Sequence, residues 1–355
     1  MEVRNPPYQD SDSVNNRSGA VYQLFYDAAR KISNEALLVT PARFLFNTGL
    51  TPKDWNQKML NDDHFKIVDY FPKSADIFPS TEIKGGIVIS YINITKRFSP
   101  IREFIPDNTL RMLGERFFEN EDNISNIMYA GRSALKFNDT FLEAFPNTKE
   151  ILLARIKKKH PNVTKLSPNE EYEIKSSTFD TIDYAFFETQ PDNPMDFYQI
   201  TGLQNGKRTT KWIKKEYLSP RYPECNNITK FKVFIPESNG NGDFGEQLSS
   251  PFVGGPNSST TPTFQSIGAF DTKNEADNLL KYLKSKFLRA LLGIRKKTQH
   301  NPPKVWELIP VQDFSIKSDI DWSKSIPEID QQLYKKYGLS PKEIDFIETH
   351  VKEME

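Results

Sequence analysis

Apolar positions along the first hundred residues follow two different spacings. Between residues 18 and 32 they recur at helical spacing, and residues 52–60 repeat that pattern after a proline at the favoured first-turn position. Mainly apolar runs at residues 35–40, 65–71 and 87–94 are typical of strands. Because strands and helices alternate with short connections, the pattern predicts a parallel α/β sheet.

The rhythm changes after residue 97. Pro100, Pro106 and the acidic-polar run at residues 119–126 interrupt the alternation of strand and helix. We therefore expect a domain boundary here, with a first domain over residues 1–98 and a second over residues 99–355.

The second domain shows mostly short strands and a few long helices. Strands are expected at residues 172–175, 185–188, 197–201, 231–235, 263–270 and 306–310, and long loops at 237–263. Asn205-Gly206 predicts a tight hairpin turn. Helices are expected at residues 148–159, 272–297, 327–337 and 341–354, the second of them opened by Thr272 with Glu275 three residues later. This mixture indicates an α+β domain.

Composition narrows the class of protein. Among 355 residues, 47 basic residues balance 47 acidic ones, so any nucleic-acid surface must be a local patch. An aromatic content of 12% supports a packed core. A single cysteine, Cys225, excludes an internal disulfide framework, and no apolar run reaches the length of a membrane span. These features predict a cytoplasmic protein without a membrane partner.

The most definite chemistry lies in Asn5-Pro6-Pro7-Tyr8. The exocyclic amine of adenine is a poor nucleophile because its lone pair is delocalised into the ring. The Asn5 amide oxygen and the Pro6 carbonyl can accept both amine hydrogens and free that lone pair, while the two prolines hold the acceptors rigid. Tyr8 can stack on a base flipped out of the duplex. The four residues are thus candidate catalytic residues; the alternative is a Pro-rich turn that only begins the fold.

Further stretches accompany this motif: a helix and strand over residues 21–40, a strand running into a basic-aromatic pair at 39–44, the stretches 76–79 and 83–88, and a long segment at 268–330. Together they resemble the adenine-specific DNA methyltransferases of type II restriction-modification systems, of the TaqI-like type that includes Eco-type fused restriction and methylation enzymes. The resemblance is strong at both ends of the chain and weak between residues 100 and 250. It implies a partial Rossmann-like methyltransferase sheet followed by an α+β target-recognition domain.

The resemblance also implies ligands and partners. Phe78 would pack against the flipped adenine opposite Tyr8, although a core position for Phe78 is the alternative. S-adenosylmethionine would donate the methyl group to double-stranded DNA. In the family, the donor pocket is a Gly-rich strand-turn-helix upstream of the Asn-Pro-Pro-Tyr motif, and four residues cannot hold it. The chain is therefore expected to be a truncated or split enzyme, inactive alone, whose N-terminal half comes from a second polypeptide.

The candidate DNA contacts lie on the predicted hairpin. It carries a cluster of cations around one aromatic ring: Lys207, Arg208, Lys211, Trp212, Lys214 and Lys215. Such cations neutralise phosphates, and a hairpin can reach base edges. An ordinary solvated hairpin is the alternative. A second basic patch at Arg155, Lys157, Lys158 and Lys159 is typical of a solvated helix.

Two other classes of function stay open. The chain could be a non-catalytic DNA specificity module, which needs only the hairpin. It could instead be a fragment of a restriction endonuclease, because Glu82 and Lys84 after Asp69 or Asp76 loosely fit a metal-dependent nuclease pattern. The four histidines are far apart and lack cysteine neighbours, so no metal site is expected.

Overall fold

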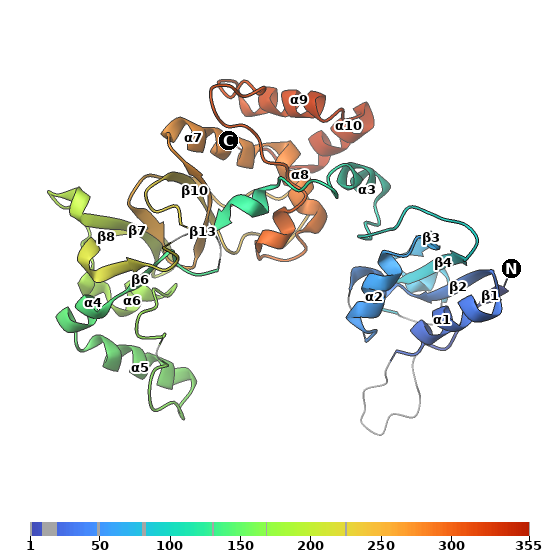
Figure 1. The fold of residues 1–355 in the computed structure, drawn as a ribbon, viewed down its shortest axis with the longest axis horizontal. Helices are drawn as coiled ribbons and strands as arrows, with labels where there is room; N and C mark the ends of the chain where they lie inside the picture. Colours follow the sequence, from blue (N-terminus) through green and yellow to red (C-terminus); the bar gives the residue numbers. More distant parts are fainter. Residues whose placement is uncertain are drawn as a thin grey trace. The chain divides into compact units, whose positions relative to one another are not determined.

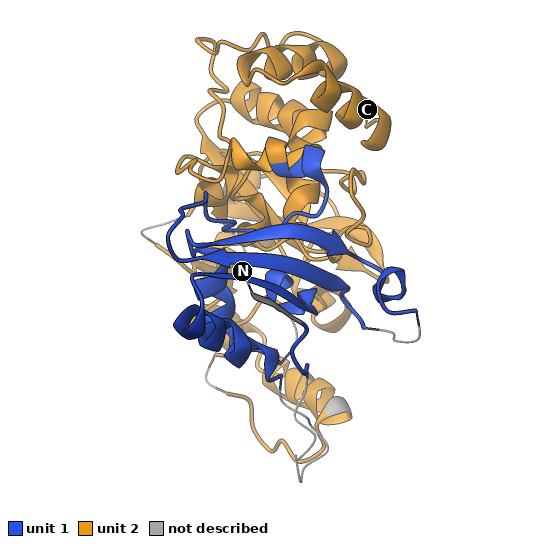
Figure 2. Ribbon diagram, turned by 90° about the vertical axis from the view of Figure 1, so that its right-hand side faces the viewer, with its two compact units in different colours: residues 1–111 blue, residues 112–355 orange. Residues whose placement is uncertain are grey.

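The computed structural model describes residues 2–8, 20–47, 50–79, 83–129, 131–167, 169–223 and 226–354 (Figure 1). It forms two compact units, residues 1–111 and residues 112–355 (Figure 2). Cys225 and the polar segment at residues 10–16 lie outside the described residues. Among the helices that are described, none is both long and apolar enough to cross a membrane.

The first unit is built on a four-stranded mixed sheet. Its strands are β1 (Glu2–Arg4), β2 (Glu35–Pro41), β3 (Phe65–Phe71) and β4 (Ile87–Asn93), arranged in the order β1-β2-β4-β3. β1 and β2 pair parallel, whereas β4 runs antiparallel to both of its neighbours. The expected strands β2, β3 and β4 are present, but the expectation of an all-parallel sheet is wrong, and β1 was not expected.

The direction of β4 follows from the connection that precedes it. α1 (Tyr22–Ile32) lies between β1 and β2, and a helical crossover of this kind allows parallel pairing. Between β3 and β4 the described residues contain only the short 3-10 helix η2 (Ser74–Asp76). Without a helix to carry the chain back across the sheet, β4 returns antiparallel beside β3.

One face of this sheet carries the core of the first unit. α1, α2 (Lys53–Leu60) and the 3-10 helix η1 (Ala42–Phe46) pack against alternate residues of β2 and β4 in a single cluster. The ring of Phe44 is fully buried among other aromatic rings. The fully buried hydroxyl of Tyr26 bonds to Thr40 Oγ1 at 2.8 Å and to Ser90 Oγ at 2.7 Å, so its polar atom is satisfied inside the core.

The described residues of the second unit form three small sheets. The largest is antiparallel and has the order β11-β10-β13-β5, formed by β5 (Met128–Tyr129), β10 (Phe231–Pro236), β11 (Phe252–Gly254) and β13 (Phe264–Phe270). A three-stranded sheet joins β12 (Ser258–Thr260), β7 (Phe197–Gln204) and β8 (Lys207–Lys214), and β6 (Leu135–Phe137) pairs with β9 (Leu218–Pro220).

Helices surround these sheets. They include α4 (Asp139–Ala144), α5 (Thr148–Lys159), α6 (Thr178–Thr181), α7 (Lys273–Lys284), α8 (Lys286–Arg295), α9 (Ile326–Lys336) and α10 (Pro341–His350), while α3 (Asn108–Glu115) begins in the first unit and ends in the second. α7 packs on β10, and α8 contacts α9 and α10. The expected helices α5, α9 and α10 are confirmed, as is the Asn205-Gly206 hairpin, whose two turn residues have φ of 49° and 75°.

Several local expectations for the second unit are wrong. Residues 172–175 and 185–188 are not strands. The strand expected at residues 306–310 is also not formed, and a 3-10 helix (Pro303–Trp306) ends where it was expected to begin. The expected long helix over 272–297 is broken between α7 and α8. The break is at Ser285, whose backbone is extended and whose buried side chain accepts the Leu288 N–H, beginning a new helix. Hydrophobic spacing continues across the break and could not reveal it.

The titration of Asp330 on α9 can test how α9 contacts the start of α8. Its carboxylate accepts the N–H groups of Lys286 (3.0 Å) and Phe287 (2.9 Å) at the start of α8, and burial raises its pKa to about 6. Because this exceeds the unfolded value of about 3.9, the folded state binds the proton more tightly. The contribution of Asp330 to stability is complete below about pH 4 and is lost as the pH rises through 6.

We expect the free energy of unfolding of wild type minus that of Asp330→Asn to fall by at most about 3 kcal/mol between pH 4 and pH 7. Denaturant titrations of both proteins across this range measure the difference, and other carboxyl groups cancel between the two. A pH-independent difference would contradict the raised pKa.

Candidate functional site

Four segments meet at one edge of the first sheet. β1, β2 and β3 run in the same direction, since β1 pairs parallel with β2 and both β2 and β3 oppose β4. Their carboxyl ends therefore share an edge, followed by residues 5–8, by η1 and by residues 72–79 respectively, and the turn that leads into β4 returns to the same edge (Figure 1). In open α/β sheets, ligands bind at such carboxyl ends.

The Asn-Pro-Pro-Tyr motif forms its own internal contact there. The Tyr8 hydroxyl donates a hydrogen bond to Asn5 Oδ1 at 2.7 Å. Asn5 is exposed, Pro6 is buried, and the half-buried Tyr8 ring packs against the core of the unit. Burial raises the pKa of Tyr8, which keeps the hydroxyl protonated and able to donate. An amide oxygen has two lone pairs, so Asn5 is oriented by Tyr8 and still able to accept one further N–H.

A glycine turn fixes the other side of the edge. Gly86 has a φ of 79°, and a Cβ at that position would lie 2.3 Å from the Phe71 carbonyl oxygen. The Ala42 N–H donates to Gly86 O at 3.0 Å, and Arg43 Nε donates to Lys84 O. Hydrogen bonds therefore tie the turn before β4 to the residues after β2, and the turn passes the end of β3 so closely that residue 86 must be glycine.

Phe78 lies in the segment that follows β3. Its N–H donates to Ser74 O at 2.7 Å, and the Ser74 hydroxyl accepts the Ile83 N–H at 2.8 Å, which closes the loop. The Phe78 side chain is half-buried. Phe78 and Tyr8 thus follow the two outer strands, β3 and β1, at the same edge of the sheet, and in the described residues their rings do not contact each other.

A buried polar group near this edge was missed by the sequence analysis. Asn47, which ends η1 in a left-handed conformation with a φ of 54°, accepts a hydrogen bond from Asn56 Nδ2 at 3.1 Å. Asn56 is only 1% exposed, and its Oδ1 has no hydrogen-bond partner in the described part of the chain. Hydrophobic spacing carries no signal for such a pair, because a turn brings the two amides together.

The six candidate DNA-binding residues of the hairpin do not share one environment. Lys207 and Arg208 are exposed near its tip. The Arg208 guanidinium lies over the rings of Phe252 and Phe264, 4.8 and 5.3 Å from their centroids. Lys214 pairs with Glu216 at 3.1 Å, Lys215 lies over the Tyr198 ring, and Trp212 is half-buried with its backbone paired to Phe187.

Lys211 requires a correction. Its side chain is fully buried, and its ammonium forms ion pairs with Asp183 and Glu188. Burial alone would lower the pKa of Lys211, but these two carboxylates outweigh it and raise the pKa. Alternation along β8 places Lys211 on the same side as the buried Ile213. Lys211 is therefore paired with two carboxylates of its own unit and is not placed to neutralise a phosphate.

The structure adds no support for the nuclease pattern of Glu82 and Lys84. Glu82 lies outside the described residues, and the Lys84 carbonyl is occupied by Arg43. Within the described ranges, no three or more His, Cys, Asp or Glu side chains gather in a group that could hold a metal ion.

Comparison with known proteins supports the methylase resemblance for the first unit. Residues 3–78 match the family model described as Eco57I restriction-modification methylase, a segment that includes Asn5, Tyr8 and Phe78. No curated protein sequence matches the chain. Among solved structures, the Type IIL restriction-modification enzyme MmeI in complex with DNA is similar at 8% identity and a TM-score of 0.32, over 98% of this chain and 56% of that one. The chain thus spans little more than half the length of that enzyme.

Proposed function

We propose that this chain is part of an adenine-specific DNA methyltransferase of a restriction-modification system. In that enzyme the first unit would bind the target adenine. The observation that carries this proposal is the Asn5–Tyr8 hydrogen bond at the carboxyl edge of the sheet, inside the segment that matches the methylase family. It orients the amide oxygen that the chemistry requires. The MmeI likeness is too distant to add to this argument.

The proposed roles follow from hydrogen-bonding capacity. Asn5 Oδ1 and the Pro6 carbonyl accept the two hydrogens of the adenine amine, which localises the nitrogen lone pair for attack. The Tyr8 ring stacks on the flipped base, and Phe78 supports it from the loop after β3. Tyr8 also holds the Asn5 amide in place through its hydroxyl.

The methyl donor is a separate question. S-adenosylmethionine would supply the methyl group, but the described residues fit only the acceptor side of the reaction. After β1 and β2 the chain continues with the motif and with η1, and neither is a Gly-rich turn into a helix followed by an acidic residue for the ribose. The donor pocket would therefore lie outside the residues described here.

The test is methyl transfer from S-adenosylmethionine carrying a tritiated methyl group. The purified chain is incubated with double-stranded DNA, alone and after co-expression with the polypeptide that the upstream coding region specifies, and the nucleosides are analysed. We expect label in N6-methyladenine only in the second reaction. Label in cytosine, or none in either reaction, would overturn the proposal. Salt-dependent DNA binding without transfer would instead support the non-catalytic specificity module.

DNA binding by the second unit yields a separate prediction. Lys207 is exposed at the hairpin tip, whereas Lys211 is buried in ion pairs. We expect Lys207→Ala to reduce the slope of log affinity against log salt concentration by about 1, because one phosphate contact is lost. Fluorescence anisotropy with labelled duplex between 50 and 200 mM salt measures this slope. Lys273→Ala, which removes an exposed cation of α7, is the control. An unchanged slope in Lys207→Ala would remove the hairpin tip from the DNA surface.

A further inference from the structure

The second unit contains a small hollow that none of the candidate catalytic or DNA-binding residues lines, although Asp330 and Lys286 do. It has a volume of about 240 Å³ and lies between the first turn of α8, the start of α9 and the C-terminal segment. Its walls include Lys284, Lys286, Arg289, Asp330 and Glu353. A single water needs only about 10–15 Å³ of such volume, so the hollow has room for a polyatomic anion.

The guanidinium of Arg289 is the unusual group in this wall. Arg289 is 2% exposed, its Nε donates to Lys284 O at 3.2 Å, and neither Nη1 nor Nη2 has a hydrogen-bond partner among the described residues. Burial lowers the pKa of Arg289 to about 10, so it remains a cation at neutral pH. A buried cation with unused donors is costly unless a counter-ion occupies them.

Three of the lining residues carry carboxylates, and two of these are engaged elsewhere. Asp330 uses its two oxygens for the backbone N–H groups of Lys286 and Phe287. Glu348 accepts from Lys286 Nζ at 2.7 Å and from the Tyr334 hydroxyl at 3.0 Å. The carboxylate of Glu353, on an exposed residue, makes no hydrogen bond or ion pair within the described chain. The charge of Asp330 acts on Arg289, but none of these carboxylates accepts a hydrogen bond from its two terminal nitrogens in the described residues.

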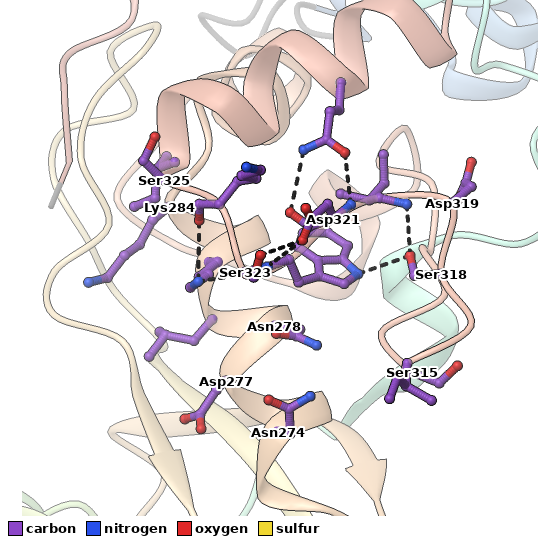
Figure 3. Close-up of a pocket in the computed structure, with 18 residues that line it drawn as sticks. Asn274, Asp277, Asn278, Lys284, Ser315, Ser318, Asp319, Asp321, Ser323 and Ser325 are labelled. Atoms are coloured by element: carbon purple, nitrogen blue, oxygen red, sulfur yellow. Dashed lines mark hydrogen bonds between the residues drawn. The ribbon is translucent and has the colours of Figure 1, made fainter.

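Lys284 is a further cation in the wall of this hollow. It also lines a larger open hollow of about 1080 Å³ beside α7, together with Ile326. Figure 3 shows Lys284 and Ser325 at one side of that larger hollow, opposite Ser315 and Ser318. The Lys284 ammonium has no ion-pair partner in the described residues, so it can turn toward an anion in the smaller hollow.

We propose that the hollow beside Arg289 binds a small phosphate-type oxyanion, held by the Arg289 guanidinium and the Lys284 ammonium. The planar guanidinium presents two parallel N–H donors that match two oxygens of one phosphate. Entry requires side chains in the wall to turn aside, and those of Lys284 and Glu353 are not held by other contacts. The enclosed position of Arg289 excludes the phosphate backbone of a DNA duplex, so the ligand is a free anion or the phosphate of a small molecule.

The test is titration of the full chain with inorganic phosphate at constant ionic strength, followed by calorimetry and by thermal unfolding. Saturable binding at one site is expected, and at ten times the dissociation constant the melting temperature of the second unit should rise by about 3–5 °C. Arg289→Met should abolish binding and Lys284→Met should weaken it, while Glu353→Gln should strengthen it by removing a competing carboxylate. Acetate in place of phosphate should bind more weakly.

Arg97→Met is the matched control, because the Arg97 side chain is 82% exposed in the first unit. It should bind phosphate like wild type. Circular dichroism establishes that each variant is folded, and Arg289→Lys tests the need for a planar fork if Arg289→Met unfolds. Non-saturable phosphate effects that are equal in wild type and the Arg289 variants would overturn the proposal and leave water as the partner of Arg289.

Discussion

Replacement of Asn5 by alanine is expected to lower the methyl-transfer rate of the assembled enzyme by at least 100-fold. Loss of one preorganised hydrogen-bonding group at the reacting centre typically costs about 10²–10³ in rate. Asn5 is exposed, and in the described part of the chain its side chain bonds to Tyr8, so the fold should be unaffected. Single-turnover transfer from S-adenosylmethionine, with DNA affinity determined in parallel, separates the chemical step from binding.

Two variants make this prediction specific. Tyr8→Phe removes the hydroxyl that orients Asn5 but keeps the ring, so it should lower the rate by about 10-fold or less, as expected for lost positioning rather than lost chemistry. Asn61→Ala removes an exposed asparagine of the same unit, at the end of α2, and should leave the rate unchanged. Wild-type rates in Asn5→Ala would show that the motif is only a turn at the start of the fold.

Phe44→Ala is expected to destabilise the first unit by about 3–5 kcal/mol, the usual cost of deleting a buried aromatic ring. Phe44 is 0% exposed, and its ring lies 5.3–6.3 Å from the rings of Tyr22, Tyr26, Trp55 and Phe65. It also follows Arg43 directly, so the cavity would lie under the carboxyl edge. Hydrogen exchange of the β2 and β4 amides should become at least about 100-fold faster, since 1.36 kcal/mol corresponds to a factor of ten.

Phe46→Ala is the matched control for this prediction. It lies on the same 3-10 helix two residues later but is 37% exposed, with ring contacts to Tyr70 and Phe104. Its loss should cost about 1 kcal/mol, as for a half-exposed side chain. Exchange of the β10 amides in the second unit reports whether either effect spreads. Equal effects of the two variants would show that the aromatic cluster is not the core of the first unit.

Much of the local structure was determined by the sequence itself. The strand at Phe65–Phe71 and the helix at Thr148–Lys159 were predicted to the residue, because apolar spacing and flanking residues act within each segment. The Asn205-Gly206 turn could also be predicted from the sequence, since both residues tolerate positive φ. The candidate chemistry of Asn5 and Tyr8 also came from residue types alone, and the family match covers that part of the chain.

Only the tertiary structure decided how these segments meet. The antiparallel direction of β4 depends on the missing crossover helix, and the break at Ser285 depends on a buried hydroxyl that begins a second helix. Lys211 turns inward because Asp183 and Glu188 come from distant positions to meet it. The terminal nitrogens of Arg289 lack a hydrogen-bond partner in the described residues for the same kind of reason, since the nearby Asp330 carboxylate accepts backbone N–H groups instead. Long-range pairing of polar groups sets these features, and spacing along the chain reports only which residues are apolar.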